Sequence, residues 1–367
     1  MHKSVSISAT SDSSRPVVRG GPLDALRFVA ALFVVIFHFG STAPVNLREL
    51  HPIWDRGYLA TDFFLLLSGF VLARAYGKAL LAGQLTPWRF WIKRFWRGYP
   101  THIITLALLV ILVLAATAIG SPPDHPERFP LSGIPAQIFL LQAFGLGGSE
   151  WNIPAWTLSV LLLCYAFLPW TWRAISKVPT ATAAIGLALL IMAVSQYISL
   201  QVLDHSVFNL PAQWATFRCL PMYLSGLLVA RAVETAQWPA RTFRLLALGG
   251  CLALLADALW ISSDLLAAYA ICVLTLGFGG LLVTKPLPGA AWGAQISFCL
   301  FMTHTLTGAV LFAGAIPVLA KFAPGLLSGP AGWTLWLGTL VIAIIVADLF
   351  DRLIDAPIQR YIRKRWF

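Results

Sequence analysis

The sequence predicts an all-α polytopic membrane protein with about ten transmembrane helices. Of its 367 residues, 58% are hydrophobic and 11% are charged, whereas a typical soluble domain is about 45–50% apolar and about 25% charged. The mean hydropathy is +0.77, which indicates that repeated apolar segments rather than one compact core organise the chain. This composition excludes an ordinary water-soluble protein.

The apolar segments define the expected spans. A spanning helix needs about 20 apolar residues. This criterion predicts ten spans, at residues 22–41, 57–76, 101–119, 155–172, 180–199, 213–231, 245–262, 265–284, 290–315 and 333–351. Residues 131–148 are apolar as well, but Pro and Gly bound them, so charge rather than hydropathy must decide whether they cross.

The distribution of Lys and Arg predicts the orientation, because cytoplasmic loops are enriched in these residues. With a cytoplasmic N-terminus and no crossing at 131–148, 20 of the 26 Lys and Arg residues lie inside, four lie outside and two lie within spans. A crossing there turns the basic C-terminus outward, against the rule. We therefore expect 131–148 to be a re-entrant or interfacial segment on the outer side, with both termini cytoplasmic.

The chain divides into three expected parts. They are a cytoplasmic N-terminal tail (1–21), one transmembrane domain (22–357) and a basic cytoplasmic C-terminal tail (358–367). Residues 1–21 lack the apolar region of a secretory signal, so we expect the first span to act as the targeting signal. Basic residues occur between apolar stretches, which favours membrane topology over nucleic-acid binding. The five cysteines show no metal-binding spacing, so no metal site is expected.

The first span carries Arg27 and His38 on one helical face. Eleven residues at 100° per residue return to nearly the same direction, about 16.5 Å further along the axis. Ionisable groups inside a bilayer are costly, so each is a functional candidate. Arg27 is expected nearer the cytoplasm and His38 nearer the outer side. The structural alternative is that Arg27 pairs with Asp24 while His38 lies at the outer interface.

The second span places Asp62 near its outer end, at a depth similar to that of His38. A carboxylate there can orient and polarise an imidazole, although helix packing or a cap explains Asp62 as well. Ser68 and Gly69 are small residues of the kind that let membrane helices approach closely. For Ser68 we expect packing rather than a nucleophilic role.

The inner segment 87–100 is the most basic part of the chain and interleaves its charges with Trp. This pattern is typical of an interfacial helix. Arg94 and Arg97 are neighbours on one face, and their forked guanidinium groups suit phosphate oxygens. Anchoring to anionic lipid headgroups explains the pattern nearly as well, so both interpretations remain open.

Further polar or aromatic candidates occur in the later spans. They are Trp156, Ser159, Tyr165, Arg218 and His304. A single His or Arg inside a helix is more often a structural hydrogen-bonding partner than a catalyst, and we favour that role for Arg218 and His304.

Together these segments resemble the membrane acyltransferase-3 family over nearly the whole chain. The family motifs are an Arg or Lys separated by ten residues from a His, a G-x-D-x-F-F-x-x-S-G-F type segment, RxxR followed by Pro, N-x-P-x-W-x-L-S, R-x-L-P-x-x-x-x-G, S-[YF]-x-L-x-x-x-H and a closing acidic-x-Pro. The chain matches the first motif with Arg27 and His38. It matches the second only approximately, with Gly57, Asp62, Phe63, Phe64, Ser68, Gly69 and Phe70. The other five motifs are matched, in the same order, by Arg94, Arg97 and Pro100; by Asn152, Pro154, Trp156, Leu158 and Ser159; by Arg218, Leu220, Pro221 and Gly226; by Ser297, Phe298, Leu300 and His304; and by Asp355 and Pro357. Each motif is weak alone, and seven in order are strong.

One position departs from the family pattern. Many members carry a Glu two residues after the Ser of the W-x-L-S motif, where this chain has Leu161. An acceptor-binding or acid–base role of that Glu is therefore missing or moved. We also expect no appended extracytoplasmic hydrolase-like domain of the kind that some members carry.

The resemblance implies transfer of an acyl group, usually acetyl from cytoplasmic acetyl-CoA, to a hydroxyl of an extracytoplasmic or lipid-linked carbohydrate. His38 is then the general base, oriented by Asp62 or another group, unless an acyl-enzyme forms. Arg94 and Arg97 hold CoA phosphates, and Arg27 engages the donor. The later-span candidates either contact the acceptor or are structural. The acyl-CoA is a substrate, and no permanently bound cofactor is expected.

Two other functions stay open at this stage. O-acylation of a small molecule uses the same chemistry with another acceptor. A transporter or flippase also carries buried charges and helix-breaking Pro and Gly, but paired broken helices and repeat halves are not evident in the sequence. We expect a bacterial inner-membrane location and acyl-CoA, carbohydrate and lipid partners without nucleic acid. The sequence makes no prediction of an oligomeric state.

The charge asymmetry predicts that a tag placed after Phe367 is reached only after the cells are permeabilised. Single cysteines introduced at 148–153 should instead react with a membrane-impermeant reagent in intact cells. Labelling of the C-terminal tag in intact cells would contradict the orientation. Labelling of 148–153 from the cytoplasm alone would contradict the outer placement of 131–148.

Overall fold

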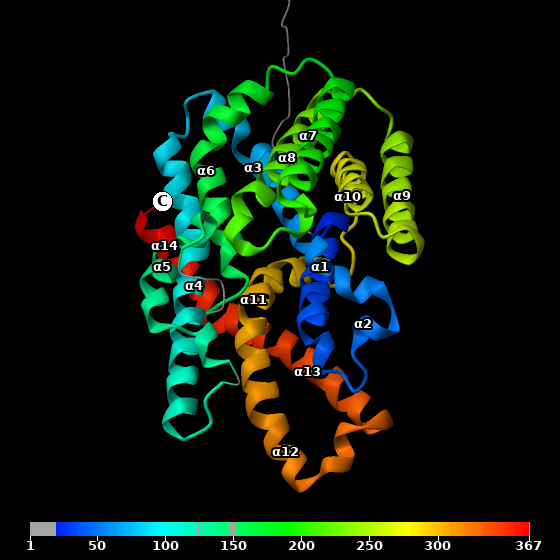
Figure 1. Cartoon of the computed structure of the whole chain (residues 1–367). Coiled ribbons are helices and arrows are strands. Elements are labelled where there is room, and N and C mark those ends of the chain that lie inside the picture. Colours follow the sequence, from blue (N-terminus) through cyan, green and yellow to red (C-terminus); the bar gives the residue numbers. More distant parts are fainter. Residues whose placement is uncertain (1–19, 124, 147–150, 367) are drawn as a thin grey trace, which may run out of the picture.

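The computed structural model describes residues 20–123, 125–146 and 151–366, and within these ranges it is helical and has no strand (Figure 1). The long helices are α1 (Pro22–Phe39), α3 (Tyr58–Leu81), α4 (Pro87–Ala118), α6 (Ala155–Ile175), α7 (Ala181–Leu203), α8 (Ala215–Thr235), α9 (Ala240–Ala256), α10 (Asp264–Gly279), α11 (Ala290–Gly308) and α13 (Gly329–Phe350). Each coincides with one predicted span, so the all-α polytopic membrane class is confirmed. Most of the N-terminal tail lies outside the described residues.

Shorter elements connect or extend these helices. They are α2 (Leu47–Leu50), a 3-10 turn (Pro52–Arg56), α5 (Ile134–Ile138), α12 (Ile316–Phe322) and α14 (Ala356–Trp366). A π-helical turn (Asp351–Asp355) joins α13 to α14 without a break. The segment expected as a C-terminal tail is thus helical up to Trp366. Figure 1 shows α14 beside the first part of α4, far from it in sequence.

Eight of the described helical segments are long and apolar enough to cross a membrane by length and composition. The two predicted spans that miss this criterion are α8 and α10. Most of the side chains of α8, including Arg218, are buried against other helices, and α10 has only 16 residues. A helix surrounded by protein can carry polar groups that a lipid-facing helix cannot. Helix α8 is therefore internal to the bundle, and α10, with nine of its 16 residues buried, packs against α8 and α9.

The basic segment before the third span is not a separate interfacial helix, which corrects the sequence-based expectation. α4 begins after the Thr86 side chain, which accepts from the Arg89 N–H at 3.3 Å, and it continues through Pro100. Proline removes the N–H that the Trp96 carbonyl would otherwise accept. Gln359 of α14 donates to that carbonyl instead, at 3.1 Å. At 1.5 Å per residue, 32 residues span about 48 Å, so the basic start extends beyond a hydrocarbon core of about 30 Å.

Residues 131–146 do not form a spanning helix. Their longest helix, α5, has five residues and rises only about 7.5 Å. The segment is tied to the bundle by Ser159, whose hydroxyl accepts from the Ala143 N–H at 3.0 Å and donates to the Leu140 carbonyl. The prediction that this segment does not cross the membrane as a helix is therefore confirmed for its described part. The last two residues of the predicted segment lie outside the described ranges.

Glycines let α3 and α8 pack almost backbone to backbone. A Cβ on Gly226 would lie 1.9 Å from the Leu66 carbonyl oxygen. One on Gly69 would lie 2.3 Å from the Tyr223 carbonyl oxygen. Real Cβ atoms do not approach this closely, so only glycine fits at either place. The packing role expected for Gly69 is confirmed.

Glycines also allow α1 and α11 to pack closely. A Cβ on Gly293 would meet the Phe28 side chain at 2.8 Å, and one on Gly308 would meet the Phe39 ring at 2.8 Å. Because the earlier residues of the two helices meet each other and so do the later ones, α1 and α11 run side by side in the same direction. Residues at corresponding positions of these helices are therefore at the same depth.

Candidate functional site

Two cavities meet at a group of basic side chains. One has a volume of about 1000 Å³ and lies among α1, α3, α4, α11 and α14, and the other has about 230 Å³ and lies among α1, α3, α4, α6 and α11. Arg27, Val71, Arg94 and Arg97 line both of them. The structure thus brings together the three arginines that the sequence assigned to the donor.

The larger cavity, which we call the vestibule, is electropositive. Its lining includes six basic residues, Arg27, Lys93, Arg94, Arg97, Arg360 and Arg363, and three acidic ones, Asp24, Asp351 and Asp355. Helix α14 contributes Arg360 and Arg363, which the sequence placed in a tail without a role. This excess of positive charge suits a ligand with several negative charges.

Arg97 is fixed at one edge of its guanidinium group. Its Nη1 donates to both carboxylate oxygens of Asp355, at 3.2 and 3.1 Å, and the Thr101 hydroxyl donates to the same carboxylate at 2.7 Å. The guanidinium carbon lies 4.9 Å from the centre of the Phe298 ring. Asp355 is 3% exposed whereas the Arg97 side chain is 40% exposed, so the arginine is held from its buried side and faces the cavities.

Arg94 has an unused hydrogen-bond donor in the same wall. Its Nη2 donates to the Tyr76 hydroxyl at 2.8 Å. Its Nε is buried and has no hydrogen-bond partner among residues 20–123, 125–146 and 151–366. Leaving a buried donor unpaired is destabilising by about 1–3 kcal/mol, so this nitrogen marks a place where an acceptor from a ligand would be stabilising.

Three potential metal ligands lie beside this wall. The Cys299 sulfur and one carboxylate oxygen each of Asp351 and Asp355 come within 4.8 Å of one another. Asp355 is already paired with Arg97, and Asp351 accepts from Gln295. Because Arg97 neutralises one of the two carboxylates, we assign the cluster to holding that arginine rather than to a divalent cation.

The smaller cavity, which we call the channel, has a mostly apolar lining. Its walls include Phe64, Leu161 and Phe301, and a hydrogen-bonded pair of hydroxyls from Ser68 and Tyr165, 3.0 Å apart, also faces it. Leu161, which stands where many family members carry Glu, therefore makes the channel wall apolar. Ser68 is a channel residue in addition to any packing role.

The structure joins two histidines that the sequence left apart. The rings of His38 on α1 and His304 on α11 have centroids 5.0 Å apart and planes inclined at 35°. His304 is fully buried, and its Nδ1 lies 2.8 Å from the Phe301 carbonyl oxygen. The Phe301 ring, 6.2 Å from the His304 ring, also lines the channel. His304 thus lies next to a residue that lines the channel.

A sequence signal for this pair existed. In the predicted topology, the first and ninth spans both run from the inside outward, so a histidine late in each is expected at a similar depth. The motif positions of His38 and His304 carried that information, but depth alone does not say which spans are neighbours.

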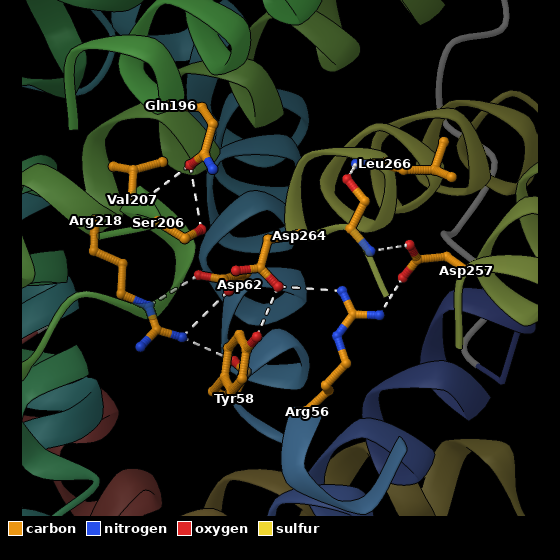
Figure 2. A network of polar contacts seen from close by, with 11 residues as sticks. Arg56, Tyr58, Asp62, Gln196, Ser206, Val207, Arg218, Asp257, Asp264 and Leu266 are labelled. Atoms are coloured by element: carbon orange, nitrogen blue, oxygen red, sulfur yellow. Dashed lines mark hydrogen bonds and ion pairs between the residues drawn. The ribbon is translucent and has the colours of Figure 1, made fainter. Parts of the chain in front are cut away.

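Asp62 does not contact His38. It is fully buried, and its two oxygens accept from Nε and Nη2 of Arg218, each at 3.2 Å (Figure 2). Arg218 also donates to the Tyr58 carbonyl at 2.9 Å and lies 5.2 Å from the Trp156 ring centre. Within the described part of the chain no hydrogen bond joins Asp62 to His38. Asp62 was expected to orient His38. In the structure its carboxylate instead forms an ion pair that joins α3 to α8.

The ion pair continues into a larger polar network. The Tyr58 hydroxyl donates to Asp264 at 2.7 Å, and Arg56 donates to Asp264 at 3.1 Å and to Asp257 (Figure 2). Desolvation lowers the pKa of Arg56, but its bonds to Asp257, above all, and to Asp264 outweigh it and raise the pKa above the ordinary value. The network links the α3 entry to α9 and α10. Sequence reasoning missed these residues because Arg56 and Tyr58 lie about 200 positions before Asp257 and Asp264 in the chain, so no local pattern links them.

Comparison with known proteins identifies relatives. The family model described as acyltransferase domain matches residues 22–352. Protein 2 in picA locus of Rhizobium radiobacter is 32% identical over 200 residues, which are 50% of this chain and 100% of that protein. Acyltransferase MdmB of Streptomyces mycarofaciens is 25% identical over 385 residues, covering 95% of this chain and 94% of that protein. No solved structure matches the chain.

The Asp62–Arg218 geometry predicts a structural effect of breaking the pair. Asp62→Asn should lower the free energy of unfolding by about 3–5 kcal/mol, because it leaves Arg218 buried without a counter-ion. The double variant Asp62→Asn/Arg218→Gln should regain much of that loss. Thermal unfolding in detergent measures both. A single variant that unfolds at the wild-type temperature would contradict the structural role.

Proposed function

The chain belongs to the membrane acyltransferase-3 family and is an acyltransferase, and from this premise we propose a donor, an acceptor and a set of residue roles. The proposed reaction transfers acetyl from cytoplasmic acetyl-CoA to a hydroxyl of an extracytoplasmic or lipid-linked glycan such as exopolysaccharide or O-antigen. The observation that carries the proposal is the convergence of Arg27, Arg94 and Arg97 where the vestibule meets the channel.

The vestibule is proposed to hold the nucleotide end of the donor. Acyl-CoA carries phosphate groups, and forked guanidinium groups bind phosphate in a bidentate manner. The unpaired Nε of Arg94 and the exposed edge of Arg97 supply such donors at one place. Arg27, on α1, is assigned to positioning the donor where the vestibule narrows. Acyl-CoA remains a substrate, and no permanently bound cofactor enters this scheme.

The channel is proposed to hold the pantetheine arm and the acyl group. Its volume of about 230 Å³ is about a quarter of the vestibule's volume of about 1000 Å³, which favours a thin chain in the channel and the nucleotide in the vestibule. The paired hydroxyls of Ser68 and Tyr165 can hydrogen-bond to amides of the arm, while the apolar walls exclude water from the thioester. The arm then points toward Phe301 and the histidine pair.

His38 is the proposed general base. A sugar hydroxyl is a poor nucleophile near neutral pH, and imidazole can take its proton with little adjustment of pKa. As the hydroxyl gives its proton to His38, its oxygen bonds to the thioester carbonyl carbon. The C–S bond then breaks, and the CoA thiolate takes the proton from His38. Acyl transfer through an enzyme-bound acyl group is the alternative route.

Membrane location and acceptor follow from the same scheme. A cytoplasmic donor and an outer acceptor require a chain that spans the bacterial inner membrane, with lipids around it and, in the lipid-linked case, as carriers of the acceptor. A small hydroxylated molecule is the second acceptor class, since the transfer chemistry is the same. A transporter or flippase is disfavoured by the family assignment.

The double variant Arg94→Ala/Arg97→Ala should weaken CoA binding about 100-fold or more, because hydrogen bonds to charged groups contribute about 1.5–3 kcal/mol each. Calorimetry on purified protein measures the affinity. Arg89→Ala is the matched control, since Arg89 lies on the same helix and lines neither cavity. An unchanged CoA affinity in the double variant would indicate that Arg94 and Arg97 anchor the protein to lipid headgroups and do not bind CoA.

His38→Ala should lower acyl transfer by about 100-fold or more, the loss expected for a general base, while leaving CoA affinity near the wild-type value. Mass spectrometry of surface polysaccharide should show the same missing acetyl group as in cells without the protein. His125→Ala, at an exposed position outside both cavities, is the control. Near-normal transfer by folded His38→Ala protein would reject the mechanism, and a polysaccharide unchanged in cells without the protein would reject the glycan acceptor.

A further inference from the structure

His304 carries a buried nitrogen that the fold leaves without a partner. Its Nδ1 lies 2.8 Å from the Phe301 carbonyl oxygen, and a carbonyl only accepts hydrogen bonds, so the proton of the neutral ring is on Nδ1. Nε2 therefore presents a lone pair. This atom is buried and has no hydrogen-bond partner within the described ranges. A buried acceptor left unpaired is destabilising, so an N–H or O–H donor next to Nε2 would stabilise the protein.

His38 is the neighbouring ring that can supply that donor. The two ring centroids are 5.0 Å apart, which is short enough for one N–H···N bond of about 2.9–3.0 Å between ring edges. The rings are tilted by 35°, and His38 is only half-buried, which leaves its ring room to turn toward His304. Gly293 and Gly308 keep α1 and α11 in close contact on either side of the pair, so this approach is built into the packing.

We propose that His304 is the positioning residue for His38: its Nε2 accepts a hydrogen bond from one ring N–H of His38 and so directs the other ring nitrogen toward the acceptor hydroxyl. The assignment rests on the proposed function and deepens it. It gives to His304 the orienting role that the sequence offered to Asp62, whose two oxygens are both engaged by Arg218.

A neutral partner fits this location better than a carboxylate. The pair lies between two apolar helices, where an unpaired charge is costly to bury. A neutral imidazole fixes the tautomer of His38 as an aspartate would, but it adds no charge. It also attracts the proton less strongly than a carboxylate does. His38 can therefore return that proton to the departing thiolate.

Two amide variants separate the two nitrogens of His304. In His304→Asn the side-chain amide replaces Nδ1 and can still donate to the Phe301 carbonyl, but nothing accepts from His38. In His304→Gln the longer side chain can place its oxygen near the position of Nε2. Thr303→Val is the control, because Thr303 is the residue directly before His304 and is also buried. Among the described residues, its hydroxyl donates only to the Cys299 carbonyl of its own helix.

The assay is acyl transfer from acetyl-CoA by full-length protein in lipid nanodiscs, with kcat, KM and CoA affinity measured separately. His304→Asn should lower kcat at least about tenfold, since the base loses its fixed tautomer, and should leave KM for acetyl-CoA and CoA affinity within about twofold. His304→Gln should restore most of the lost kcat, and Thr303→Val should match the wild type. A purely structural role would not produce this separation between kcat and KM or the rescue by Gln.

Several outcomes overturn the assignment. Wild-type kcat in His304→Asn shows that Nε2 is not needed, and equal losses in folded Asn and Gln variants show that the acceptor at Nε2 is not the cause. If the Asn variant does not fold, loss of transfer in folded His304→Gln is decisive against the proposal. Absence of transfer by wild-type protein that still binds CoA overturns the proposed function itself, which distinguishes that failure from the failure of the His304 assignment alone.

Discussion

The absence of water in the hydrocarbon region is the constraint on which the structure depends. A polar group there must find its partner within the protein. Asp62 and Arg218 form an ion pair, and Arg218 also donates to the Tyr58 carbonyl, so these groups join α3 to α8. Arg94 Nε and His304 Nε2 are buried without partners in the described part of the chain. At these two positions of the proposed site, a hydrogen bond to a ligand or to a reacting partner would be stabilising.

Glycine contacts determine where those polar groups meet. Gly226 and Gly69 allow α3 and α8 to approach so closely that the Asp62–Arg218 pair is sealed between them. Gly293 and Gly308 do the same for α1 and α11, whose parallel course sets His38 and His304 at one depth. Since membrane helices gain no hydrophobic energy by leaving lipid for each other, close packing of small residues is a main source of their association.

The division between vestibule and channel follows from α4 being one continuous helix. Its basic start extends beyond the hydrocarbon thickness, and Gln359 of α14 supplies the hydrogen bond that Pro100 removes. Helix α14 is thereby held against α4, where Arg360 and Arg363 add to the positive lining. Further along, Leu158 and Leu161 of α6 make the channel apolar. A charged end and an apolar end in series match the two ends of an acyl-CoA.

The sequence by itself determined the helical spans, the place of the basic segment and, through motif spacing, the choice of Arg27, Arg94 and Arg97 as donor candidates, because hydropathy, charge and motif spacing are local properties of the chain. It did not determine which helices are neighbours. The partners of Asp62 and His38 were therefore assigned by depth alone, and depth is shared by every helix that crosses. Only tertiary packing, through close contacts at a few glycines, decided that Asp62 meets Arg218 and that His38 meets His304.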